Sequence, residues 1–254
     1  MPFTVRVVGI FTRNSRSSAT ADQRRARVLA DVAAANAAWF SGFSPGVRCE
    51  ISFVATAIYN SSTIINASTV AGVADPRVDR LIQQVRTLRN QQAAIYVVYL
   101  SGDRLADGFA VGNGGPRFTF FNSTASYGLV GHVVLTDIAG TTFARYVLAH
   151  EAGHVLFGRF LTNSPLSFTI NDPSNPGSSH NNNSQNLMFP VVPANNPFIN
   201  AAQCIVARRS RVLIENAASG AAAKRSNTAM LRRLNRSAIF QARKAMRTGK
   251  RKSR

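Results

Sequence analysis

The chain has 254 residues, of which 45% are hydrophobic, and a formal net charge of +19. This length suits one large or two small domains, and the hydrophobic content is ordinary for a globular protein with a sizeable core. No apolar run approaches the 18 residues of a membrane-spanning helix, so we expect no transmembrane segment. The N-terminal sequence lacks signal-peptide features, so we expect either a cytoplasmic location or export by a signal-independent route.

The positive charge is unevenly distributed along the chain. Residues 221–254 contain 12 Lys or Arg and no acidic residue. Residues 1–220 therefore contain the other 18 basic residues and all 11 acidic ones, for a net charge of +7. The predicted folded part is modestly basic, and the C-terminal tail is strongly basic.

The first elements predict an alternation of strands and helices. Residues 4–11 carry the apolar pattern of a buried strand. Thr20 and Gln23 form a capping-box pattern that opens a helix, and Gly42 ends it. A second strand is predicted near residues 47–58, where apolar and polar side chains alternate.

The next part of the chain continues this alternation. A helix begins at Pro76, a residue that loses no hydrogen bond at the first helical position. Residues 93–100 are a continuous apolar run typical of a central strand. Residues 102–128 are rich in glycine and turn formers and predict one or two short strands. Residues 129–136 predict another strand, in which we interpret His132 as a core or edge residue and not as a ligand.

The segment that follows has the pattern H-E-x-x-H, formed by His150, Glu151 and His154. On a helix, side chains four residues apart lie on one face, so the two imidazoles can bind one zinc ion. Glu151 is placed to act as the general base on a water molecule. Apolar residues flank the pattern on both sides, which predicts a mostly buried helix, with residues 140–142 as its N-terminal cap.

This chain resembles a zincin metallopeptidase, closest in style to the metzincins. Those enzymes carry a third histidine after a glycine turn and, later, a methionine turn below the metal. Met188, in Asn-Leu-Met-Phe-Pro, is similar to that turn. The spacing departs from the metzincin pattern, because Gly158 is four residues after His154 and position 160 is Phe.

The resemblance implies a third metal ligand beyond the helix. His180 is the only histidine there, eight residues before Met188, and we assign it this role. Asp172 competes as an oxygen ligand, although aspartate before proline is often a turn former. Glu215 competes as the ligand of a zincin in which a later helix supplies a glutamate.

The order of elements predicts an α/β layered fold, and the resemblance implies a zincin-like α/β (α+β) fold with a mixed twisted sheet. We divide the chain into an N-terminal subdomain, residues 1–158, that ends with the metal-binding helix, and an irregular C-terminal subdomain, residues 159–216. The latter holds the ligand loop, the methionine turn and a final helix over residues 200–216. Residues 217–254 form the basic tail.

By resemblance, part of residues 102–128 has a substrate role as an edge strand, although an ordinary surface segment is equally compatible with its composition.

The chain has two cysteines, Cys49 and Cys204. They can pair, but a chain of this size with so few cysteines is not a disulfide scaffold. We therefore favour the interpretation that they are two buried thiols.

The basic tail leaves several interpretations open. Residues 217–226 have the composition of a linker, and residues 227–247 have a weak apolar face compatible with a helix. The tail can bind nucleic acid or another polyanion, lie on an anionic membrane surface, or serve as a signal for export or packing machinery. A solvated disordered tail is the alternative.

The sequence thus favours a zinc-dependent metalloendopeptidase in which His150, His154 and His180 hold Zn²⁺ and Glu151 is the general base. The alternative is a non-enzymatic, polyanion-binding protein on a zincin-like scaffold. No obvious prodomain restrains such an enzyme, so we expect either narrow specificity or delivery into another cell as a toxin or effector.

Overall fold

A computed structural model of the protein describes residues 3–16, 19–89, 94–123, 126–141 and 144–215. Residues Pro2–Ile214 form one compact unit. The sequence-based interpretation of the basic tail as a linker and a helix lies outside the described residues.

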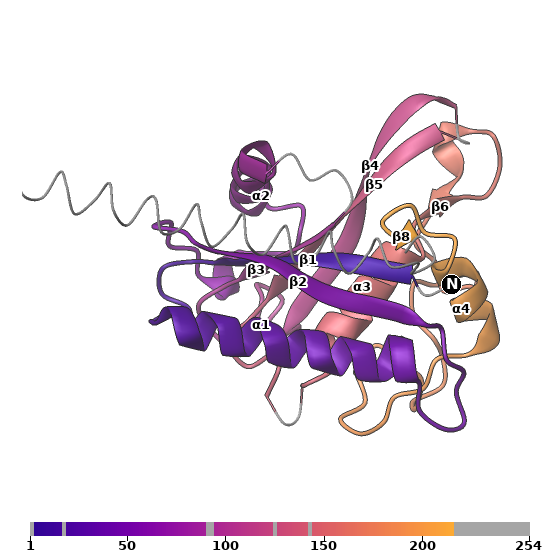
Figure 1. The fold of residues 1–254 in the computed structure, drawn as a ribbon, viewed down its shortest axis with the longest axis horizontal. Coiled ribbons are helices and arrows are strands. Elements are labelled where there is room, and N and C mark those ends of the chain that lie inside the picture. The colour runs from indigo at the N-terminus through magenta and orange to yellow at the C-terminus, as the bar shows by residue number, and fades with distance from the viewer. Residues whose placement is uncertain (1–2, 17–18, 90–93, 124–125, 142–143, 216–254) are drawn as a thin grey trace, which may run out of the picture. The chain divides into compact units, whose positions relative to one another are not determined.

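The centre of the fold is a twisted mixed sheet. Its strands lie in the order β2-β1-β3-β5-β4 (Figure 1). Parallel ladders join β2 to β1, β1 to β3 and β3 to β5, whereas β4 is antiparallel to β5 at the edge. The strands are β1 (Phe3–Phe11), β2 (Ile51–Asn60), β3 (Ile95–Tyr99), β4 (Gly112–Ser123) and β5 (Ser126–Leu135). The predicted mixed α/β fold class is confirmed.

Helices cover both faces of this sheet. Helix α1 (Ala21–Asn36) and helix α3 (Val147–Leu156) share one hydrophobic core with the sheet, and helix α2 (Pro76–Arg89) packs in the core of the other face. The side chains of β3 alternate between these two cores, because successive side chains of a strand point to opposite faces. Both faces being buried explains the continuous apolar run in this strand. No helix among the described residues is long and apolar enough to cross a membrane.

The helical segment that starts with α1 begins and ends where its sequence predicts. The Thr20 side chain accepts from the backbone N–H of Gln23, and the Gln23 side chain accepts from the backbone N–H of Thr20. The helix continues as a π-helical turn, Ala37–Ser41, and the chain then reverses at Gly42, whose φ is 70°. A Cβ atom at Gly42 would lie 2.7 Å from the carbonyl oxygen of Val47, so the turn requires glycine.

Strand β4 corrects the prediction for residues 102–128. In place of one or two short strands, the structure has a 12-residue strand that forms a hairpin with β5, and β5 begins at Ser126 and not at residue 129. Two glycines allow β4 to lie directly against α3. A Cβ atom at Gly112 would lie 2.5 Å from a methyl carbon of Val147, and one at Gly114 would lie 2.6 Å from the carbonyl oxygen of Glu151.

The chain after α3 contains only short elements. These are β6 (Arg159–Phe160), a 3-10 turn (Pro165–Ser167), β7 (Phe168–Thr169), α4 (Ala201–Ala207) and β8 (Ile214–Glu215), which pairs with β1; another 3-10 turn (Ala67–Thr69) precedes α2. The prediction of a final helix to residue 216 is wrong, because α4 ends at Ala207 and Glu215 lies in a strand. The predicted cap at residues 140–142 is also wrong, since α3 begins at Val147 and its N-cap, Tyr146, makes no side-chain hydrogen bond.

The interpretation of the two cysteines as thiols is wrong. Cys49 and Cys204 form a disulfide with their Cα atoms 5.1 Å apart. Their separation of 155 residues hides this proximity in the sequence. Nearby, the Arg208 Nε atom donates to the carbonyl oxygen of Cys49 at 2.8 Å. Together these contacts fasten α4 to the segment that precedes β2.

His132 is a core residue of β5, as its sequence context predicts. Its side chain is fully buried, and neither ring nitrogen has a hydrogen-bond partner among the described residues. The nearest charged atom is the Asp79 Oδ1 atom, 3.7 Å from its Nδ1 atom. The pKa of His132 is lowered to about 4, mainly by burial; the charges of Arg117 and Arg86 act in the same direction, and that of Asp79 opposes them.

We expect His132 to make the metal-free protein less stable as the pH falls. The unfolded chain takes up a proton near pH 6.5, whereas the folded chain takes it up only near pH 4, so stability is lost across this window. A shift of this size corresponds to about 3 kcal/mol. The free energy of unfolding, measured with urea at several pH values, should therefore fall less steeply in His132→Leu than in the wild type. Parallel curves for the two proteins would contradict the assignment, because the other three histidines are common to both.

Candidate metal centre

Helix α3 places His150 and His154 side by side within the fold. The whole helix is buried, and Trp39 fixes it by donating its Nε1–H to the carbonyl oxygen of Ala149 at 2.9 Å. His150 donates its Nδ1–H to the carbonyl oxygen of Leu187 at 2.7 Å, because a carbonyl can only accept. This hydrogen bond fixes the tautomer of the neutral ring, so its Nε2 atom carries a free lone pair. That Nε2 atom lies 3.2 Å from the Nε2 atom of His154.

His180 completes a cluster of three imidazoles. Its ring centroid lies 5.3 Å from that of His150 and 4.9 Å from that of His154. One nitrogen from each of the three rings lies within 4.8 Å of the others, and these residues are the only such group of potential metal ligands among the described residues. The structure thus brings together the three histidines that the sequence selected.

The turn that carries Met188 packs directly below α3. Met188 is fully buried, and its thioether sulfur lies against Gly153, one residue before His154. The backbone carbonyl of Met188 accepts from the Asn181 N–H at 2.8 Å, and its own N–H donates to the Asn186 side chain at 2.9 Å. One short turn therefore contacts the helix and, through Leu187, orients His150. It also holds the loop that carries His180.

Asp172 lies in a polar network beside this turn and not in the histidine cluster. Its carboxylate is fully buried and accepts from the backbone and hydroxyl of Ser174, from the Asn181 side chain and from the Gln203 side chain. Gln203, on α4, also exchanges two hydrogen bonds with the side chain of Asn186. We infer that Asp172 orders the loop of His180. The side chain of Glu215 is outside the described part of the structure, so its role as a ligand stays a prediction.

Sequence reasoning missed Asn181, Asn186 and Gln203 as residues that position the site. All three are buried, and each links two separate segments through its amide group. The unusual density of asparagine in residues 171–200 is the sequence signal for the two asparagines, and Gln203 stands three residues after Asn200 in a capping-box pattern. Buried amides must find partners, so such a density in a segment without regular structure indicates a polar network.

Burial keeps the three imidazoles neutral. It lowers the pKa of His150 to about 4 and lowers those of His154 and His180 as well. Neutral imidazole is the form that binds a metal ion. The His154 Nδ1 atom is buried and has no hydrogen-bond partner among the described residues, so the hydrogen bonds of the protein do not satisfy this cluster. The donor set therefore fits a metal ion that accepts three nitrogen ligands.

Glu151 lies beside this cluster, against the edge strand. Its side chain is buried, and burial raises its pKa to about 8, whereas a hydrogen bond from the backbone N–H of Gly114 partly offsets this rise. A Cβ atom at Gly112 would lie 3.1 Å from its Oε1 atom, so β4 forms one wall around the carboxylate. A carboxylate with a pKa in this range can accept and return a proton near neutral pH.

We expect Gly153→Ala to destabilise the protein, although the same change usually stabilises a helix by up to about 1 kcal/mol. The added methyl group would overlap the Met188 sulfur and lie 3.3 Å from the Trp39 ring. Overpacking of this kind costs about 1–3 kcal/mol, to be measured by chemical unfolding. Gly177→Ala is the matched control, because a Cβ atom there meets nothing within 4 Å. Equal stability of the two variants would contradict the close packing of the turn against α3.

The chain was also compared with known protein families, curated proteins and solved structures. No protein-family model matches the chain, and no curated protein matches its sequence. Among solved structures, it is similar to metalloproteinase-II from Bacteroides fragilis, with 16% sequence identity and a TM-score of 0.49. The match covers 82% of this chain and 52% of that protein, so the chain spans about half the length of its structural neighbour.

The fold and the cluster together define a mixed α/β protein with a buried site that can hold a metal ion. The site is built from one helix, one turn and one loop, and each of them is fixed by hydrogen bonds or by close packing.

Proposed function

We propose that the protein is a zinc-dependent metalloendopeptidase. The observation that carries this proposal is the cluster of His150, His154 and His180 with a buried glutamate next to it on the same helix. Three neutral imidazoles are a donor set that suits zinc and leaves a fourth position for water or substrate. A zinc ion held there supplies Lewis acidity, which polarises a carbonyl group and makes water a stronger acid near neutral pH.

Glu151 has the role of general base in this proposal. It accepts the proton of the attacking water and then returns a proton to the nitrogen of the leaving amine. The position of the carboxylate supports this role, because it lies next to the first histidine of the pattern on the same buried helix. A scaffold that only binds metal has no need of a buried carboxylate at this position, because burial of a carboxyl group is unfavourable.

We also propose that β4 binds the substrate backbone. It is the edge strand of the sheet, and its glycines lie against Val147 and Glu151 of the metal-binding helix. An extended peptide can pair with the free backbone groups of an edge strand, which gives affinity without strict sequence selection. Such pairing would place a peptide bond near the histidine cluster.

The direct test is proteolysis by metal-loaded and metal-free protein. Zinc-loaded protein should cleave an unfolded protein substrate and generate new peptide N-termini, identified by mass spectrometry. Removal of the metal with a chelator should abolish cleavage, and one equivalent of zinc should restore it. Undiminished cleavage by verified metal-free protein would contradict the proposal.

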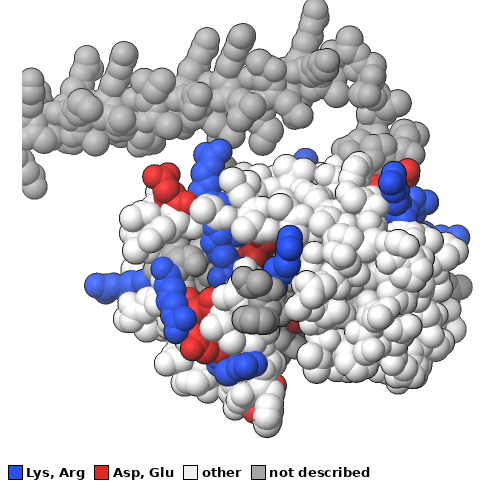
Figure 2. All heavy atoms as spheres, turned by 90° about the horizontal axis from the view of Figure 1, so that it is seen from below, with Lys and Arg blue, Asp and Glu red and all other residues white. Residues whose placement is uncertain are grey.

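For the basic residues 221–254 we propose a separate role in binding a polyanion, such as nucleic acid. Support comes from their 12 basic residues without any acidic one. On the face of the folded unit in Figure 2, by contrast, arginines are interspersed with acidic side chains on one side and the rest carries little charge. Binding through phosphate contacts must weaken steeply with salt, so DNA affinity that is insensitive to salt would exclude this role.

A further inference from the structure

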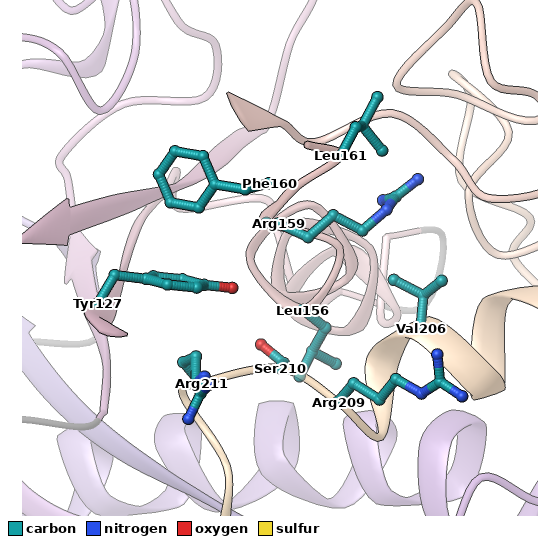
Figure 3. A pocket seen from close by; sticks show the side chains of 10 residues that line it. Tyr127, Leu156, Arg159, Phe160, Leu161, Val206, Arg209, Ser210 and Arg211 are labelled. Carbon is teal, nitrogen blue, oxygen red and sulfur yellow. The ribbon is translucent and has the colours of Figure 1, made fainter. Parts of the chain in front are cut away.

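A pocket with a volume of about 420 Å³ lies at the C-terminal end of α3, apart from the histidine cluster. Its walls come from β5, the end of α3, the β6 segment, and α4 with the turn after it (Figure 3). None of its lining residues belongs to the histidine cluster. The proposed peptidase activity gives this pocket no role.

The lining of this pocket has a marked excess of positive charge. Arg159, Arg209 and Arg211 all line it, and no acidic residue does. Arg159 and Arg209 form no ion pair with any carboxylate whose side chain is described. Like charges gathered in a partly enclosed space repel one another, and a bound anion relieves this repulsion.

Arg159 is held in place rather than mobile at the surface. Its Nη1 atom donates to the carbonyl oxygens of Phe157 at 2.9 Å and Asn171 at 3.0 Å. Burial lowers the pKa of this guanidinium, whereas the charges of Asp172 and Tyr127 oppose the shift. A fixed and partly desolvated guanidinium binds an oxyanion more strongly than a solvated one, because less order and less hydration are lost on binding.

Two hydroxyl groups add neutral donors to the same space. The Ser210 Oγ atom is buried and has no hydrogen-bond partner among the described residues. Figure 3 shows the hydroxyl oxygens of Tyr127 and Ser210 pointing toward the space between them. The guanidinium of Arg211 lies 5.6 Å from the centre of the Tyr127 ring. An unsatisfied buried hydroxyl is uncommon in proteins, and a ligand that accepts from it explains its presence.

We propose that this pocket binds a phosphate group, either as free phosphate or on a small phosphomonoester. Figure 3 shows the guanidinium groups of Arg159 and Arg209 on one side of the pocket and Arg211 with the two hydroxyls on the other, so a ligand contacts only some of these groups directly. Together they still supply more positive charge than a carboxylate with one negative charge can balance. A phosphate carries close to two negative charges and at least three strong acceptor oxygens, which matches this lining. The basic residues 221–254 have the wrong sign of charge to neutralise this pocket.

Isothermal titration calorimetry of the zinc-loaded protein tests this proposal. The probes are inorganic phosphate, phenyl phosphate and acetate, each at the same ionic strength. We expect phosphate or phenyl phosphate to bind at millimolar concentration or below, and acetate to bind at least roughly tenfold more weakly because it forms fewer charge-assisted hydrogen bonds. Preference for phenyl phosphate over phosphate would identify a phosphomonoester as the ligand, and the reverse would identify the free ion.

Variants locate the binding. Arg209→Gln should weaken phosphate binding by roughly tenfold, and Ser210→Ala should weaken it by several-fold. Arg80→Gln is the matched control, since Arg80 is an exposed arginine on α2 outside the pocket, and it should leave the affinity within about twofold. If Arg209→Gln does not fold, Arg209→Lys tests the same contact, because lysine keeps the charge but lacks the bidentate geometry.

Four results would overturn the proposal. These are the absence of phosphate binding, equal binding of acetate, equal losses in Arg209→Gln and Arg80→Gln, and binding that disappears when zinc is removed but not when Arg209 is changed. The last result would place the phosphate on the metal. None of these outcomes depends on peptidase activity, so the phosphate site and the proposed function can fail independently.

Discussion

Glu151→Gln is expected to abolish peptide hydrolysis while the fold and the zinc content remain unchanged. Glutamine has nearly the same shape as glutamate but cannot accept the proton of the attacking water. Removal of a general base lowers the rate by about 10²- to 10⁴-fold, so kcat should fall by this factor. The zinc content should stay at one per chain, because Glu151 is not one of the three clustered histidines.

The environment of Glu151 makes this substitution a selective test. The carboxyl group is buried, and burial raises its pKa to about 8, so in the metal-free protein it is mostly protonated and neutral at pH 7. A neutral amide of nearly the same shape should therefore not unfold the protein. Glu50→Gln is the control. Glu50 is exposed, forms an ion pair with Arg208, and is not part of the histidine cluster. Hydrolysis that persists in Glu151→Gln, measured by the rate of new N-terminus formation, would exclude the proposed mechanism.

Apolar periodicity and capping signals made most of the fold predictable. The capping box at Thr20 and the glycine at residue 42 mark the two ends of one helical segment, and the structure has both. The continuous apolar run around β3 correctly indicated a strand covered on both faces. These signals are local, because each depends on residues a few positions apart.

The edge strand β4 was less predictable, for a physical reason. Its sequence begins Gly-Asn-Gly-Gly-Pro, which is typical of a loop, since glycine and proline disfavour the interior of a strand. In the structure the glycines are needed because α3 leaves no room for Cβ atoms at two of these positions. The local preference and the tertiary requirement conflict here, and the conflict lies beside Glu151, where we propose that substrate binds.

The sequence predicted the histidines, Glu151 and the turn of Met188, but not the contacts that hold them in place. The spacing of His150 and His154 reveals a shared face, and His180 is the single histidine that follows them. The disulfide joins residues 155 positions apart, and the network of Asp172, Asn186 and Gln203 joins three separate segments. Such pairings follow from the folded arrangement of the loops, and no local pattern in the sequence encodes them.

His180→Ala is expected to cause a large loss of zinc. Loss of a residue that merely orients a metal ligand weakens binding by about 10- to 100-fold, so loss of a ligand should weaken it by at least about 100-fold. In the proposed centre, His180 is the one ligand that α3 does not supply, and two imidazoles from one helix cannot enclose an ion alone. Zinc per chain, measured by elemental analysis after dialysis against a weak chelator, should fall from one to near zero.

His132→Leu is the matched control for this experiment, because the chain has only four histidines and His132 is the one outside the cluster. It should keep one zinc per chain. Retention of zinc by His180→Ala would contradict the three-histidine centre and would require an oxygen ligand in its place. Asp172 could take that role only by giving up hydrogen bonds from Ser174, Asn181 or Gln203, which together order the loop. We therefore expect Asp172→Asn, with His180 intact, to retain zinc. This result would support the roles of Asp172 in positioning the loop and of His180 in binding the metal.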